Sequence, residues 1–81
     1  MPSEILTWHR LELDVPIRTQ MIRKIMELAL YYNSNLTDDF IQRLPDLAKK
    51  VEMVLYVEAV SMRTYADLKT LKRRIKAISN S

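Results

Sequence analysis

The chain of 81 residues contains no glycine and no cysteine, and each absence excludes a class of function. Phosphate-cradling loops and dinucleotide-binding turns need glycine where the backbone approaches the ligand closely. Without cysteine there are no disulfide bonds or thiolate metal sites, and nothing argues for a secreted protein. Nucleotide chemistry is therefore not expected. An all-helical chain is favoured, because tight β-hairpin turns also prefer glycine.

Catalytic groups are equally scarce. His9 is the only histidine, so no histidine pair can bind zinc or relay protons. The 10 acidic residues are spread along the chain, and none is paired with a histidine or cysteine at a catalytic spacing. General acid–base catalysis needs a positioned group with a tuned pKa. We therefore expect no enzymatic activity, no cofactor and no metal.

Long apolar runs and strong charge are missing as well. The longest uncharged run, residues 28–37, contains two asparagines and a serine, and it is too short and too polar to span a bilayer. Residues 1–7 lack the basic start and apolar core of a signal peptide. The formal net charge of +3 favours acidic partners but is far from that of a strong nucleic-acid binder. A soluble intracellular domain is the expectation.

What the sequence does contain is helical periodicity. Apolar residues recur at intervals of three and four over about residues 15–32, 38–59 and 62–78, as on one face of an amphipathic helix. A residue with a short side-chain oxygen precedes each segment and is suited to accept a hydrogen bond from the first helical turn. These predicted N-caps are Asp14, Thr37 and Ser61.

These segments predict an all-α fold, a compact bundle of three helices joined by short connections. Residues 1–13 form an N-terminal segment whose Trp8 is expected to pack on the bundle. Pro45 lies within the second segment. We expect it to kink or split that helix, because its ring removes one backbone hydrogen bond and clashes with the preceding turn.

The third segment pairs a narrow apolar seam with a basic face. The seam consists of Tyr65, Leu68, Leu71, Ile75 and Ile78. The basic face consists of Lys69, Lys72, Arg73, Arg74 and Lys76. Cations late in a helix complement its negative end, which explains part of this cluster without a ligand. The same charges would also attract an acidic peptide.

An ordered set of residues is similar to a known family. The set comprises Trp8-His9, Arg18, Lys24, the run Ala48-Lys49-Lys50-Val51-Glu52, Tyr56, Ser61 and Tyr65. In its order and spacing the chain resembles the KIX domain over about residues 8–78. This three-helix module occurs in the CREB-binding-protein acetyltransferases and in a mediator tail subunit.

The resemblance implies a nuclear transcriptional coactivator domain, without catalysis, that is a monomeric part of a larger protein. Its partners would be transactivation-domain peptides of transcription factors, which bind as short acidic, amphipathic helices in apolar grooves. Matched by position, a first groove would use Met21, Lys24, Ala66 and Thr70. A second groove would use Leu30, Phe40, Leu44 and Leu47. Acidic segments would be steered by the basic face, including Lys72, Arg73, Arg74 and Lys76.

Two positions depart from the family pattern. Ala66 stands where the animal domains have a second tyrosine, and Arg74 stands where a further tyrosine contacts a phosphorylated ligand. Two other interpretations of the chain also stay open. One is a small basic three-helix domain that binds nucleic acid, although its third helix offers no Asn or Gln before Asn80 for paired contacts to bases. The other is a structural bundle within a larger protein.

Overall fold

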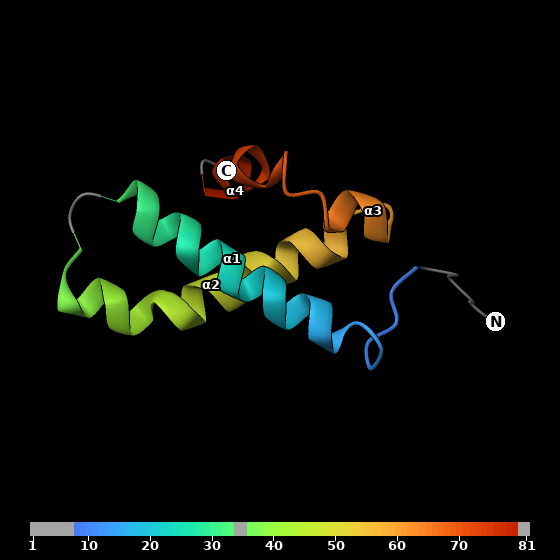
Figure 1. Ribbon diagram of the computed structural model, residues 1–81, viewed down its shortest axis with the longest axis horizontal. Coiled ribbons are helices and arrows are strands. Elements are labelled where there is room, and N and C mark those ends of the chain that lie inside the picture. Colours follow the sequence, from blue (N-terminus) through green and yellow to red (C-terminus); the bar gives the residue numbers. More distant parts are fainter. Residues whose placement is uncertain (1–7, 34–35, 80–81) are drawn as a thin grey trace.

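The computed structural model describes residues 8–33 and 36–79, and these form four helices and no strand (Figure 1). The helices are α1 (Val15–Tyr32), α2 (Asp38–Glu58), α3 (Met62–Tyr65) and α4 (Leu71–Ser79). The long helices α1 and α2 run in opposite directions and cross, and α2 also packs against α4. The predicted all-α fold with three main helices is confirmed for this part of the chain.

The core lies where α1, α2 and the start of α4 meet, and an aromatic cluster extends it to the N-terminal segment. Its buried members are Met21, Ile25, Ala48, Leu55, Tyr56, Tyr65 and Leu71. Trp8 packs against this core, and its Nε1 donates a hydrogen bond to the carbonyl oxygen of Ala59 at 2.7 Å. The rest of the predicted N-terminal segment, residues 1–7, lies outside the described residues.

All three predicted N-cap residues stand directly before a helix, and two of them make the expected side-chain bond. Thr37 Oγ1 accepts a hydrogen bond from the backbone N–H of Phe40, and Ser61 Oγ accepts one from Thr64, both at 3.1 Å. Asp14 is the N-cap residue of α1, as predicted, but its side chain makes no cap hydrogen bond, so only that part of the prediction is wrong. Its Oδ2 instead accepts hydrogen bonds from the backbone N–H of Arg10 and the hydroxyl of Tyr56, which hold the carboxylate against α2.

Pro45 does not divide the second helix. Helix α2 is continuous from Asp38 to Glu58, so the expected split is wrong. The proline removes only the N–H that would donate to the carbonyl of Ile41, and both residues are exposed, so water can satisfy that oxygen. Next to it, Leu44 and Ala48 are 3% and 1% exposed, and their packing holds the helix across the proline.

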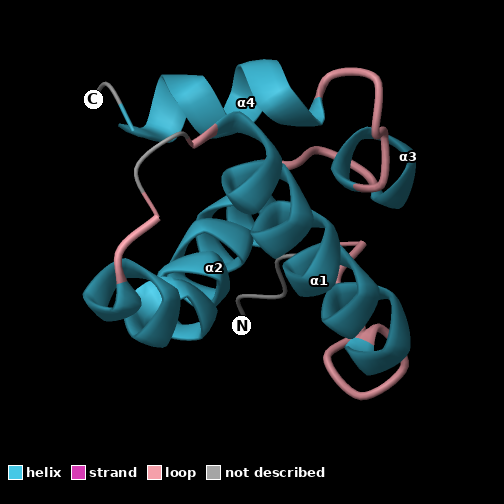
Figure 2. Ribbon diagram, turned by 60° about the vertical axis from the view of Figure 1, so that its left-hand side comes forward, coloured by secondary structure: helices cyan, strands magenta, loops and turns pink. Residues whose placement is uncertain are grey.

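The prediction of one continuous third helix over residues 62–78 is wrong, because the helix is interrupted in its middle. Helix α3 ends at Tyr65, residues 66–70 form turns, and α4 begins at Leu71. The chain changes direction between the two helices, as Figure 2 shows with α3 viewed nearly along its axis and α4 lying across the view. The reason is a tertiary contact: the side chain of Arg74 donates hydrogen bonds to the carbonyl oxygens of Tyr65 and Asp67.

Candidate functional site

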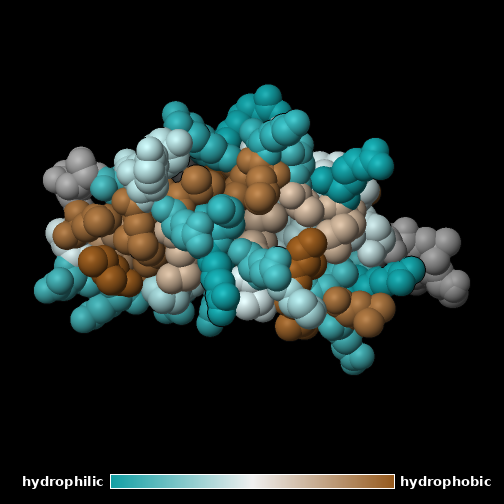
Figure 3. Space-filling model, viewed as in Figure 1, coloured by the Kyte–Doolittle hydropathy of each residue, from teal (hydrophilic) through white to brown (hydrophobic). Residues whose placement is uncertain are grey.

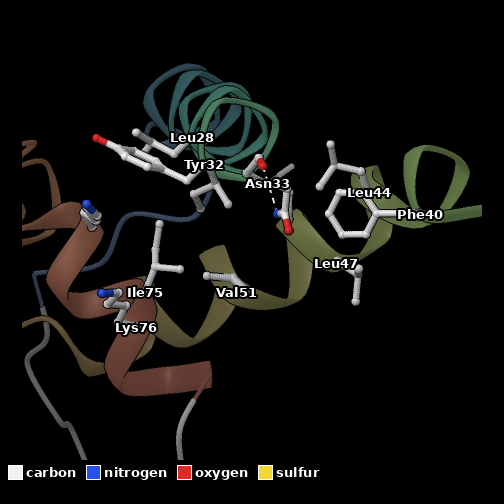
Figure 4. A pocket seen from close by; sticks show the side chains of 13 residues that line it. Leu28, Tyr32, Asn33, Phe40, Leu44, Leu47, Val51, Ile75 and Lys76 are labelled. Atoms are coloured by element: carbon white, nitrogen blue, oxygen red, sulfur yellow. Dashed lines mark hydrogen bonds between the residues drawn. The ribbon is translucent and has the colours of Figure 1, made fainter. Parts of the chain in front are cut away.

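An apolar groove of about 280 Å³ lies between α1, α2 and α4 (Figure 4). Thirteen residues line it, and ten of them are apolar: Ile25, Leu28, Ala29, Tyr32, Phe40, Leu44, Leu47, Ala48, Val51 and Ile75. The other three are Asn33, Lys72 and Lys76. These thirteen residues together form the apolar groove.

Helical periodicity explains why these side chains share one groove. Phe40, Leu44, Leu47 and Val51 follow one another on α2 at spacings of four, three and four, so they form a single stripe. The stripe is graded in depth. Leu44 is buried at 3% exposure and forms the floor, whereas Leu47 is 41% exposed and stands at the rim. The groove can therefore accept apolar side chains without any rearrangement of the core.

The charges that line the apolar groove have one sign. Lys72 and Lys76 of α4 contribute ammonium groups, and none of the lining residues is acidic. Lys72 Nζ lies 4.0 Å from the ring centroid of Tyr32, a cation–π contact that joins α4 to α1. Asn33 Nδ2 donates a hydrogen bond to the carbonyl oxygen of Ala29 at 2.9 Å. An apolar ligand with acidic flanks would fit this arrangement.

A second hollow, of about 410 Å³, lies on the other side of α4, against α2 and α3. Its lining residues are Val54, Leu55, Glu58, Ala59, Thr64, Arg74, Ala77 and Ile78. Glu58 and Arg74 bring charges of opposite sign to the same hollow. The second hollow therefore does not favour a ligand of one charge, whereas the apolar groove, lined by two lysines, favours an acidic one.

The residues predicted for the first groove lie outside both of these hollows. Met21 is 4% exposed and belongs to the core. Lys24 Nζ lies 3.2 Å from Glu27 Oε1 on the surface of α1. Ala66 and Thr70 lie in the turns between α3 and α4, and none of these four residues lines either hollow.

Most of the residues predicted for the second groove do come together. Phe40, Leu44 and Leu47 line the apolar groove, whereas Leu30 is 40% exposed and is not among the lining residues. From the basic face, Lys72 and Lys76 line the groove, and Arg73 is exposed elsewhere on α4. Arg74 lines the second hollow instead.

Sequence reasoning did not assign Leu28, Tyr32 and Ile75 to the groove. The signal for Leu28 and Tyr32 was present, since they belong to an apolar stripe on α1 that is wider than one neighbouring helix needs. For Ile75, periodicity indicated a buried seam but could not tell which helix the seam would face. That requires knowing where the third helix breaks.

A buried polar cluster holds the scaffold around the groove. Glu52 is 2% exposed and accepts hydrogen bonds from Arg18 of α1 and from the hydroxyl of Tyr65 in α3. Burial and the bond to Glu52 raise the pKa of Tyr65, so its hydroxyl stays protonated as a donor. The guanidinium of Arg18 also lies 4.0 Å from the ring centroid of Tyr56. These contacts fix the helices relative to one another.

Within residues 8–33 and 36–79, no group of three or more His, Asp or Glu side chains is placed to hold a metal ion. None of the helices in the described part of the chain is both long and apolar enough to cross a membrane. Comparisons of the chain with protein-family models, with curated proteins and with solved structures yield no match.

Proposed function

We propose that this chain is a KIX-type docking domain that binds a short acidic, amphipathic helix in the apolar groove. The observation that carries the proposal is a groove with an apolar floor, where Lys72 and Lys76 are the charged residues among the described ones that line it. Three of the four residues that the family resemblance assigns to one groove line this surface, namely Phe40, Leu44 and Leu47. The groove-forming stripe on α2 supports the proposal independently of that resemblance.

The groove suits a helical ligand. A helix docks through apolar anchors spaced at i, i+3, i+4 and i+7, and the open rim at Leu47 admits such side chains. Apolar side chains also gather on the surface around the joined ends of α1 and α2 (Figure 3), where Tyr31, Leu36 and Ile41 are exposed.

The proposed ligand has acidic residues on the flanks of its apolar face. Such residues would reach Lys72 and Lys76, which gives orientation and faster association more than affinity. A ligand that folds as it binds loses about 2–5 kcal/mol to ordering, so we expect affinity in the micromolar range, about −8 kcal/mol.

The role that follows is docking without catalysis. The chain would act in the nucleus as a monomeric domain of a larger transcriptional coactivator and bind transactivation-domain peptides. No cofactor enters this proposal, because the groove needs only apolar contacts and two ammonium groups.

The test is an NMR titration of the domain with a panel of acidic amphipathic peptides. We expect the chemical-shift changes to cluster at the groove. Leu47→Asp should weaken peptide binding by roughly tenfold or more, because it buries a charge against the ligand. Val57→Asp is the matched control, because Val57 is 62% exposed on the same helix and does not line the groove. A folded domain that responds to no peptide, or an equal loss in both variants, would refute the proposal.

A parallel titration with duplex DNA at two salt concentrations tests the nucleic-acid alternative. Docking of peptides predicts weak duplex binding that disappears as salt rises. Tight duplex binding with a steep salt dependence, together with silence across the peptide panel, would favour the alternative instead.

A further inference from the structure

The side chain of Arg74 is folded back onto the turns that separate α3 from α4. Its Nη2 donates hydrogen bonds to the carbonyl oxygens of Tyr65 at 3.2 Å and of Asp67 at 2.7 Å, and its Nε donates to Thr70 Oγ1 at 3.0 Å. Burial lowers the pKa of this guanidinium, and its Nη1 is buried without a hydrogen-bond partner. The guanidinium of Arg74 therefore makes its hydrogen bonds to the turns that precede α4.

The bonds of Arg74 replace those that a continuous helix would make. In an unbroken helix the carbonyls of Tyr65 and Asp67 would accept from the backbone N–H groups four residues later, those of Lys69 and Leu71. Here the N–H of Lys69 donates to Asp67 Oδ1, and the N–H of Leu71 donates to the carbonyl of Leu68. The guanidinium therefore donates to two of the carbonyl groups that lose their helical donors at the break, and Thr70 Oγ1 also donates to that of Asp67.

The sequence of the interrupted stretch does not itself require a break. Residues 66–70 contain neither glycine nor proline, and Ala66, Leu68 and Lys69 are good helix formers. Asp67 and Thr70 favour a turn through local hydrogen bonds, but both are tolerated inside helices. Local preference alone therefore leaves the choice open.

Leu68 shows that a continuous helix is a competing arrangement. In such a helix Leu68 would lie on the same face as Tyr65 and Leu71. In the structure Tyr65 and Leu71 are 0% and 1% exposed, whereas Leu68 is 55% exposed. The broken arrangement leaves this leucine in water, so some other contact must favour it.

We propose that Arg74 is the positioning residue that holds residues 62–79 as two helices and so fixes α4 as a wall of the apolar groove. Without its bonds to the turn, the segment continues as one helix in the direction of α3. Lys72, Ile75 and Lys76 then leave the groove, because α4 lies across that direction (Figure 2). The conformational claim stands without the proposed function, and only its consequence for binding rests on it.

The test compares Arg74→Met with the matched control Arg73→Met. Methionine keeps an unbranched stem and a good helix propensity but has no donor, and Arg73 is exposed on the same helix. We expect the backbone chemical shifts of residues 66–70 to become helical in Arg74→Met, with more helical circular dichroism. The control should keep the turn shifts of the original chain.

Two further variants complete the test. Arg74→Lys retains a cation that can reach one carbonyl, so it should restore the turn shifts in part. Thr70→Ala removes the acceptor of Arg74 Nε together with the hydrogen bond from Thr70 Oγ1 to the carbonyl of Asp67, and it should move the shifts of residues 66–69 towards helical values even if Arg74→Met does not fold. Turn shifts that persist in Thr70→Ala and in a folded Arg74→Met would overturn the proposal.

Peptide binding is measured last. Given the proposed function, Arg74→Met should weaken groove binding roughly tenfold while Arg73→Met changes it little. The two claims fail separately: helical shifts at residues 66–70 without peptide binding by the original chain would sustain the role of Arg74 and refute docking. Turn shifts that stay unchanged in Arg74→Met, together with peptide binding by the original chain, would refute the role of Arg74 and sustain docking.

Discussion

Glu52 and Arg18 form a bidentate ion pair inside the bundle. Nε of Arg18 lies 2.7 Å from Oε2 of Glu52, and its Nη2 lies 2.8 Å from Oε1, with the carboxylate side chain only 2% exposed. The hydroxyl of Tyr65 donates to the same Oε2 at 2.7 Å. One buried carboxylate thus joins α1, α2 and α3.

Replacing this carboxylate should destabilise the domain strongly. We expect Glu52→Gln to lower the free energy of unfolding by about 2–4 kcal/mol, because it leaves the guanidinium of Arg18 without its counter-charge in a desolvated site. Urea unfolding measures the change. Glu27→Gln is the control, since Glu27 pairs with Lys24 on the surface and should matter by less than about 1 kcal/mol. Equal losses in the two variants would contradict the interpretation.

Asp14 should make the stability depend on pH in acid. The hydrogen bond from Tyr56 and the one from the backbone of Arg10 lower the pKa of Asp14 below its ordinary value of 3.8. A carboxyl whose pKa is lower in the folded state adds stability above about pH 3.8, and this stability is lost as the pH falls through the folded-state pKa. The urea midpoint should therefore fall in this acid range.

Two variants isolate the contribution of Asp14. Asp14→Asn should flatten the part of the pH profile that the carboxylate causes, and Tyr56→Phe should reduce the same part, because the Tyr56 hydroxyl donates to Oδ2 at 2.6 Å. A pH profile that Asp14→Asn leaves unchanged would show that other carboxyl groups control acid unfolding.

Pro45 should be a site at which the domain can be stabilised. Alanine would restore the N–H that bonds to the carbonyl of Ile41 and would raise helix propensity, partly offset by greater freedom of the unfolded chain. We expect Pro45→Ala to raise the free energy of unfolding by about 1–2 kcal/mol. Pro16→Ala is the control, because Pro16 stands in the first turn of α1, where proline is compatible with a helix. A loss of stability in Pro45→Ala would refute this prediction.

The helices show how far periodicity reaches and where it stops. The bounds of α1 and α2 follow from apolar spacing and, for α2, from the cap at Thr37, which are local properties of the chain. The course of α2 through Pro45 and the break after Tyr65 depend on contacts between separate elements. The sequence predicted a kink or a split at Pro45 and one continuous third helix, since neither contact is visible in the local sequence.

The candidate site divides in the same way. Phe40, Leu44 and Leu47 could be assigned from sequence because they lie on one face of a single helix. Glu52 and Arg18 both carry the family resemblance, but their pairing could not be predicted, since they lie 34 residues apart in the chain. The basic residues were predicted as one face, whereas the structure separates Lys72 and Lys76 at the groove from Arg74, whose side chain bonds to the preceding turn.

That separation predicts that the basic residues of α4 contribute unequally to ligand binding. Lys72→Gln and Lys76→Gln should each weaken the binding of an acidic peptide by roughly twofold to fivefold, and both should reduce its dependence on salt, because they remove a charge that faces the ligand. Lys69→Gln is the matched control, since Lys69 is exposed and does not line the groove. Fluorescence anisotropy of a labelled peptide at several salt concentrations measures all three. Equal effects from the three lysines would mean that only net charge matters, and the groove would then have no part in orienting the peptide.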